Sequence, residues 1–392
     1  MGRYVLGGVA LLCLFVLLGW FAFHEGSSIP EQSPEPQPPP AQHNSPPPEP
    51  VADLSSETTT NLPRTGSVVT NAAVFYRQAF ELYAAITNDR AAVAVLADWR
   101  TNIDAAAEAE LCEKIRPICD LMHQASTTTN CDWGAESMTA ETIFQYLTPA
   151  RSIARTTIWS AAHCRSNDVT GATTDALSVL RLGQQLSGSS LMGCLVDMSL
   201  QNTASSYVAQ KVGLFTGTDG QRLAAAFADP AYEEALSRAI EQEAYLAERQ
   251  AAKMAAQPDG ANPAQSATIA AYYQEIANSE RQLAKALGSS SEDAYKAWLH
   301  DAAELETSNP FAKGVLGAAI DNFVEKAQRA EVNRAMVVAG LAIAQEGTGA
   351  LQSHTDPTSG KPLLYIETPD GFELQSTYQM NDKPMYLLFK QR

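Results

Sequence analysis

The sequence predicts a mostly helical protein, either an irregular helical bundle or a short α-solenoid of antiparallel helical hairpins. A small C-terminal β-hairpin follows this body, and one transmembrane helix precedes it. Three observations support this fold class. Apolar residues recur every three to four positions through most of the chain. One long uncharged stretch lies near the N-terminus. Only the part from Pro362 onward has the β-rich runs and turn residues that are typical of strands.

The uncharged stretch runs from Tyr4 to Phe23, and its twenty residues are enough for a helix to cross ~30 Å of hydrocarbon. Arg3 before it and Glu25 after it favour an N-terminus in the cytoplasm. Residues 1–25 are therefore predicted to be an uncleaved signal-anchor. This anchor would place a single-pass protein in the inner (cytoplasmic) membrane of a bacterium, with its body in the periplasm or another extracytoplasmic space. A cleaved signal peptide is the alternative, but the apolar segments of signal peptides usually span only about 7 to 15 residues.

Residues 26–66 are predicted to be a disordered, proline-rich stalk. Ten of the 21 residues from Pro30 to Pro50 are proline, and a segment with so few large apolar residues cannot bury a core. Its proline runs favour polyproline II, which makes a semi-rigid spacer. A docking segment for a proline-binding domain is the less favoured interpretation.

The remaining chain divides into a helical body, residues 67–350, and a C-terminal element, residues 351–392. The whole chain has a net charge of −17. Such an acidic protein repels nucleic acid and anionic lipid headgroups. We therefore expect no nucleic-acid partner, and a membrane contact only through the single N-terminal helix.

Caps and breakers delimit the first helices of the body. The expected helices run from Asn71 to about Ile86, from Thr148 and Pro149 to about Cys164, from Thr174 to Gly188, and from Ser190 to Gly213. Because short loops connect the last three, these helices should pack as antiparallel neighbours.

The second half of the body has longer helical patterns. They run from Pro230 to about Met254, from the loop that ends at Pro263 to Gly288, from the Ser289 and Glu292 capping pattern onward, and from Pro310 to Gly347. At 1.5 Å per residue the last helix would be roughly 50 Å long. We expect the other helices to pack on it.

After this helix, the spacing of apolar residues changes from a helical pattern to a strand-like one. Two β-rich runs, Pro362 to Thr368 and Phe372 to Tyr378, are joined by Pro369-Asp370-Gly371, which predicts a β-hairpin. Met385 to Phe389 is a candidate third strand. A hairpin is marginally stable alone, so it should pack on the helical body.

No motif for phosphate binding, for a nucleophile elbow or for a zinc protease occurs in the sequence. We therefore assign no catalytic residue and no cofactor. Cys112, Cys119 and His123 share one helical stripe and could bind zinc together with Cys131. A structural role is favoured, because no paired CxxC exists and an exported compartment promotes oxidation. No metal site is predicted.

An acidic cluster follows Pro230 on one expected helix. It consists of Glu233, Glu234, Glu241, Glu243 and Glu248. Acid–base catalysis would require a cleft and perturbed pKa values, so a solvated helix face is the favoured interpretation.

The exported part has five cysteines, an odd number that leaves at least one free thiol. Cys112 and Cys119 lie seven residues apart on one helix, a rise of about 10.5 Å that exceeds the ~7 Å limit for a bridge. Cys164 and Cys194 should lie at opposite ends of the bundle. Because a polar loop precedes Cys131 and could fold back along the helix, we predict a disulfide between Cys119 and Cys131.

Three sequence stretches together resemble an uncharacterised group of membrane-anchored, helical bacterial envelope proteins. They are Asn71-Ala72-Ala73 with Tyr76 and Ala79-Phe80, then Cys131-Asp132-Trp133, and Asp356-Pro357 with Ser359-Gly360-Lys361-Pro362-Leu363 and Tyr365. The resemblance implies a shared architecture and no activity. The last ~70 residues, a long helix before a hairpin, are also weakly similar to the C-terminal part of type II secretion pseudopilins.

The first functional hypothesis is a non-enzymatic envelope scaffold or a module that binds another envelope protein or a peptide. An enzyme of hydrolase type, with a site built from non-contiguous residues, is the second. A pseudopilin-like assembly subunit is the third.

Overall fold

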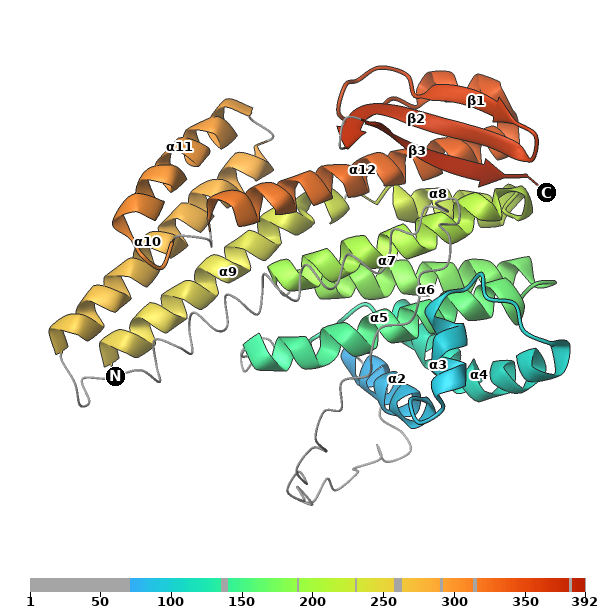
Figure 1. Ribbon diagram of the computed structural model, residues 1–392, viewed down its shortest axis with the longest axis horizontal. Helices are drawn as coiled ribbons and strands as arrows, with labels where there is room; N and C mark the ends of the chain where they lie inside the picture. Colours follow the sequence, from blue (N-terminus) through green and yellow to red (C-terminus); the bar gives the residue numbers. More distant parts are fainter. Residues whose placement is uncertain are drawn as a thin grey trace, which may run out of the picture. The chain divides into compact units, whose positions relative to one another are not determined.

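The computed structural model describes residues 71–134, 140–188, 190–229, 231–256, 263–289, 292–312, 316–380 and 383–391. This part of the chain is mostly helical and ends in a three-stranded antiparallel sheet, which confirms the predicted class (Figure 1). The predicted anchor and stalk lie outside the described residues. Within those residues, no helix is both long and apolar enough to cross a membrane.

Within the described residues, the first seven helices and one 3-10 turn build a large core. Their bounds are α2 (Ala72–Ile86), α3 (Arg90–Ala97), α4 (Ala105–Thr127), α5 (Ala140–His163), α6 (Val169–Ser187), α7 (Leu191–Gln210), η2 (Val212–Leu214) and α8 (Gly217–Phe227). As expected from their short connections, α5, α6 and α7 all pack on one another. Trp159, Tyr207 and Phe215 are buried at the centre of this core.

A second core is built by the helices that follow. They are α9 (Ala231–Ala256), α10 (Pro263–Gly288), α11 (Glu292–Ser308) and α12 (Gly317–Glu346). α9 and α10 pack along each other, and Ile240, Leu283 and Trp298 are buried between them and α11. α12 contributes Val324 to this core and Met336 to the first, so it runs from one core to the other (Figure 1).

The C-terminal sheet follows the 3-10 turn η3 (Thr348–Ser353). Its strands are β1 (Leu364–Thr368), β2 (Gly371–Met380) and β3 (Lys383–Lys390), in the order β1-β2-β3. Both the predicted hairpin and the candidate third strand are confirmed. β2 and β3 pack on α12, and β3 also contacts α7 and η2.

Three predicted helix starts are wrong. α5 begins at Ala140, so Pro149 lies inside the helix and does not start it. A proline there removes one backbone donor, but the buried residues Leu147 and Ala150 on either side hold this segment on the core.

α6 begins at Val169 and not at Thr174, because Asp168 caps it by accepting the Gly171 N–H at 2.9 Å. α12 begins at Gly317 and not at Pro310. Asn309 there forms a turn in which its side chain accepts the N–H groups of Phe311 and Ala312, so the backbone does not yet enter the long helix.

Candidate binding face and buried polar groups

The outer face of the sheet carries four large apolar side chains that are exposed. In an antiparallel sheet, residues that lie directly opposite one another point to the same face. The register places Leu364, Gln375 and Tyr386 in one row across the strands, and Ile366, Glu373 and Leu388 in the next. Leu364, Ile366, Tyr386 and Leu388 are all exposed, with Leu364 at 57% and Tyr386 at 50%. We call these four residues the apolar outer face.

The centre of this face is polar. Gln375 donates its Nε2–H to Glu373 Oε1 at 2.6 Å, and the apolar residues flank this pair on β1 and on β3. The face therefore offers two apolar ridges with one carboxylate between them. This arrangement suits a protein surface that pairs apolar side chains with a donor or a cation.

The centre of the opposite face of the sheet is buried. Phe372 and Phe389 are buried and stack with ring centroids 4.8 Å apart, and Tyr365 stacks on Phe372 at 5.4 Å. A Cβ at position 340 of α12 would overlap the Phe389 ring, so only glycine allows this close approach. The sheet is thus held firmly on α12 while its outer face remains exposed.

Asp356 fixes the chain just before β1. Its Oδ2 accepts hydrogen bonds from Ser376 Oγ, Thr377 N and Thr377 Oγ1 at 2.7 to 2.8 Å, and its Oδ1 accepts from Thr358 N and Oγ1. Burial alone would raise the pKa of Asp356, but these hydrogen bonds outweigh it and hold the pKa well below its usual value. The stretch from Asp356 to Leu363 noted in the sequence therefore has a structural role: its first residue clamps the chain before β1 to β2.

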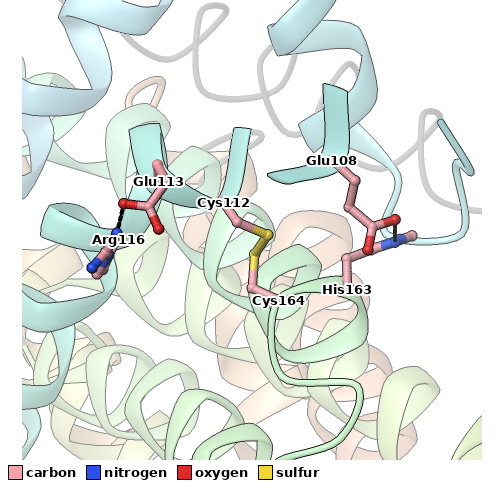
Figure 2. The surroundings of a disulfide bond; sticks show 6 residues. All are labelled: Glu108, Cys112, Glu113, Arg116, His163 and Cys164. Atoms are coloured by element: carbon pink, nitrogen blue, oxygen red, sulfur yellow. Dashed lines mark hydrogen bonds and ion pairs between the residues drawn. A yellow bond between two sulfur atoms is a disulfide. The ribbon is translucent and has the colours of Figure 1, made fainter. Parts of the chain in front are cut away.

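A disulfide joins Cys112 to Cys164, and the Cα atoms of the two residues lie 5.6 Å apart. Figure 2 shows it joining α4 to the residue that follows α5, beside the Glu108–His163 contact. His163 Nε2 lies 2.9 Å from the Trp99 carbonyl oxygen and Nδ1 lies 3.3 Å from Glu108 Oε2. This end of α5 is therefore fastened to the start of α4 by both a covalent bond and a polar contact.

The predicted bridge between Cys119 and Cys131 is wrong, because both are free thiols. Cys119 points into the first core and is fully buried. The loop that carries Cys131 does not fold back along α4. It runs to the start of α2, where the Asn130 carbonyl accepts the Ala72 N–H at 2.8 Å.

Two of the residues considered as zinc ligands make other interactions. Cys112 is oxidised in the disulfide, and His123 Nε2 lies 2.6 Å from the buried carboxylate of Asp175. Among the described residues, no group of three or more His, Cys, Asp or Glu side chains could hold a metal ion.

Burial, followed by the charge of Asp175, raises the pKa of the Cys119 thiol to about 12. This cysteine therefore stays protonated at neutral pH and is a poor nucleophile.

The acidic cluster on α9 does not share one environment. Glu234 and Glu241 are exposed, and Glu234 pairs with Arg238. Glu248 pairs with Arg281 of α10. Glu243 instead turns toward α7 and accepts the Leu191 N–H at 3.0 Å. The side chain of Glu233 lies outside the described residues.

Glu280 of α10 lies near Glu243, and sequence reasoning missed it. Glu280 is buried, and its Oε2 has no hydrogen-bond partner within the described part of the chain. Burial, and then the charge of Glu243, raises the pKa of Glu280 well above its usual value, and burial also raises the pKa of Glu243.

Another buried acid, Asp197, lies on α7. Asp197 forms a side-chain hydrogen bond with Gln201, which in turn accepts Arg334 Nη1–H of α12 at 2.9 Å. α6 approaches so closely that a Cβ at Gly183 would overlap Asp197 Oδ1. Burial raises the pKa of Asp197 to about 7, which the bond to Gln201 and the charge of Arg334 only partly offset. A lone acid in an otherwise uncharged helix was the sequence signal that could have revealed it.

The apolar outer face was also missed, although the sequence carries its signal. A strand with one buried face alternates apolar and polar residues, whereas Leu363 to Ile366 and Met385 to Phe389 are uninterrupted apolar runs. Such runs indicate that both faces of the strand are apolar. Because only one face can pack on α12, the other must be exposed or must bind a partner.

Comparison of the chain with protein-family models, with curated proteins and with solved structures found no match.

Proposed function

We propose that this protein is a non-enzymatic scaffold of the bacterial envelope, anchored in the inner membrane by residues 1–25, with the C-terminal sheet as its protein-binding element. The single observation that carries the binding role is the alignment of Leu364, Ile366, Tyr386 and Leu388 on one exposed face of the sheet. Large apolar side chains gathered on an exposed face indicate an interaction site, whereas scattered ones do not.

The extracytoplasmic location is supported by the disulfide between Cys112 and Cys164. Disulfides form and persist in oxidising compartments and are rare in the cytosol. The uncharged segment from Tyr4 to Phe23 and the proline-rich residues after it supply the means to hold the body at a distance from the membrane.

The binding role is tested with a photo-crosslinking amino acid in intact cells. Tyr386 on the apolar outer face and Tyr245 on α9 make a matched pair, because their exposed fractions are 50% and 47%. With benzoylphenylalanine at position 386 we expect a defined protein adduct, and none at position 245. Equal labelling at both positions, or no adduct at position 386, would show that the face is not a binding site.

The location is tested separately with protease added to intact spheroplasts. The body should be released from the membrane by cleavage within residues 26–66, because a segment without a core is readily cut. A body that stays protected until lysis would place it in the cytoplasm and would contradict the proposal.

A further inference from the structure

The first step of the inference concerns the edge of the sheet. The strand order β1-β2-β3 makes β1 and β3 the two edges. β3 lies against α7 and η2. β1 has β2 as its main neighbour, and its outward backbone groups lie at the sheet edge. An edge strand presents a row of N–H and C=O groups that another strand can pair with.

β1 lacks the usual protection of an edge. Natural edge strands are blunted by lysines, prolines or bulges. The five residues of β1 contain one charge, Glu367, and neither proline nor lysine, and the register of β1 with β2 has no bulge. Leu364, at 57% exposed, is the most exposed of the large apolar side chains in the described residues and lies on this strand.

We propose that β1 pairs antiparallel with β1 of a second copy of this chain and forms a six-stranded sheet across a two-fold axis. The inference rests on the proposed role of the sheet as an interaction element, and it names a second copy as one partner. Pairing around Tyr365 places Leu364 opposite Ile366 of the second copy. The two apolar outer faces then become one continuous surface.

Charge opposes a second copy only weakly at this place on the molecule. The chain carries −17, so two copies repel each other over most of their surface. Residues 364–392 contain four acidic and three basic residues, a net of −1. Pairing around Tyr365 or Ile366 also keeps Glu367 away from its counterpart, whereas pairing around Glu367 would oppose two like charges.

The area of the apolar outer face is too small for face-to-face stacking alone to hold two copies together. Three strands spaced ~4.8 Å apart and five residues of ~3.4 Å each cover roughly 240 Å². A stable dimer usually buries about 800 Å² per partner. Backbone pairing adds hydrogen bonds that stacking lacks, and anchoring in one membrane raises the effective concentration of the two edges.

The test is a cysteine scan of the full-length protein in native membranes, in a background with Cys13 and Cys131 replaced by serine. Tyr365→Cys and Ile366→Cys report on the edge, and Tyr386→Cys is the control on the same sheet but on the far strand.

After mild oxidation we expect a disulfide-linked product of twice the chain mass. Its yield should be about tenfold higher at one β1 position than at position 386, since a bridge needs Cα atoms within ~7 Å. Adding Ile366→Lys to the Tyr365→Cys variant should abolish the product, because an edge lysine opposes strand pairing.

Three outcomes would overturn the inference. They are no dimer at either β1 position, equal yields at β1 and at position 386, or a mixed disulfide with a different protein. The photo-crosslink at Tyr386 is independent of these results. If the cysteine scan fails while that adduct forms, self-pairing is wrong but the binding role stands. If the scan succeeds and no adduct forms, the sheet pairs only with itself.

Discussion

Asn71 and Asp132 are hydrogen-bonded in both directions, although 61 residues separate them in the chain. Asn71 Oδ1 accepts the Asp132 N–H at 2.9 Å, and Asn71 Nδ2 donates to the Asp132 carbonyl at 2.8 Å. The same Oδ1 caps α2 by accepting the Ala73 N–H at 3.0 Å. One side chain therefore starts a helix and also fastens the loop after α4 to it.

This joint positions Trp133. The indole of Trp133 stacks on Tyr76 with centroids 5.6 Å apart and donates its Nε1–H to the Gln185 carbonyl at 3.0 Å. The stretches around Asn71 and Asp132 thus meet in one contact between α2, α6 and the loop. Their role here is architectural.

Asn71→Ala should lower the free energy of unfolding by about 2 to 3 kcal/mol, because it removes a helix cap and two hydrogen bonds to the loop together. Chemical denaturation measures the change. Asp104→Ala is the matched control, since Asp104 caps α4 through Ala106 and Ala107 from an exposed position. We expect about 1 kcal/mol for the control. Equal losses for the two variants would show that the contact to Asp132 adds nothing.

The sequence predicted the fold where local signals and packing agree. Asn71 and Ser190 were correctly identified as helix caps, and the Pro369-Asp370-Gly371 turn correctly indicated the hairpin. Pro149 misled the prediction because proline is favoured at a helix start, whereas here tertiary packing keeps it inside α5.

The disulfide and the buried acids could not be predicted from the sequence, for a different reason. Pairing Cys112 with Cys164 depends on how α4 and α5 cross, and helical periodicity alone does not give this. Likewise, Glu243 and Glu241 look alike in the sequence. Only the position of α7 beside α9 makes Glu243 a partner for the Leu191 N–H.

Replacing both Cys112 and Cys164 with serine should lower the free energy of unfolding by about 4 kcal/mol. The bridge closes a chain separation of 52 residues, and the loop-entropy model gives that magnitude. Denaturation with and without reductant should reproduce the same loss in the native protein and none in the variant. A Cys131→Ser variant that lost as much stability under oxidising conditions would instead point to a bridge at Cys131.

Thiol labelling provides a second check on the cysteines. In the folded protein, Cys131 is half-buried and should react slowly, while the buried Cys119 and Cys194 should react only after unfolding. Burial raises the pKa of Cys131 to about 12, which keeps the reactive thiolate scarce at neutral pH. Labelling of Cys112 or Cys164 without reductant would contradict the assigned bridge.

Asp356→Ala should loosen the start of the sheet. We expect a loss of about 3 kcal/mol in the free energy of unfolding, because the Ser376 and Thr377 donors would lose a charged acceptor. Hydrogen exchange at the Thr377 amide should accelerate more than exchange in α7. Asp370→Ala, at the exposed hairpin turn, is the control and should leave both rates unchanged.

The same carboxylate makes the sheet acid-sensitive. Because the folded pKa of Asp356 lies below the value of ~3.9 in an unfolded chain, its contribution is fully present above about pH 4. That contribution is lost as the pH falls further toward the folded pKa. Wild-type protein should therefore lose stability between pH 4 and pH 2 more steeply than the Asp356→Ala variant, and parallel curves would refute the assignment.

Asp197→Asn should stabilise the protein at alkaline pH. Burial raises the folded pKa of Asp197 to about 7, whereas an unfolded aspartate titrates near ~3.9. The folded state therefore binds the proton more tightly, so its advantage is fully present below about pH 4 and is lost as the pH rises to 7. A shift of about three pKa units corresponds to roughly 4 kcal/mol at most.

Asparagine keeps the shape and hydrogen bonding of the neutral acid. The Asp197→Asn variant should therefore match the wild-type stability at pH 4 and exceed it at pH 8 by part of that amount. Unfolding free energies measured from pH 4 to 8, with the exposed Glu241→Gln as control, decide the matter. If Asp197→Asn is less stable than wild type at pH 8, Asp197 is ionised in the folded protein and its charge is stabilised by Arg334.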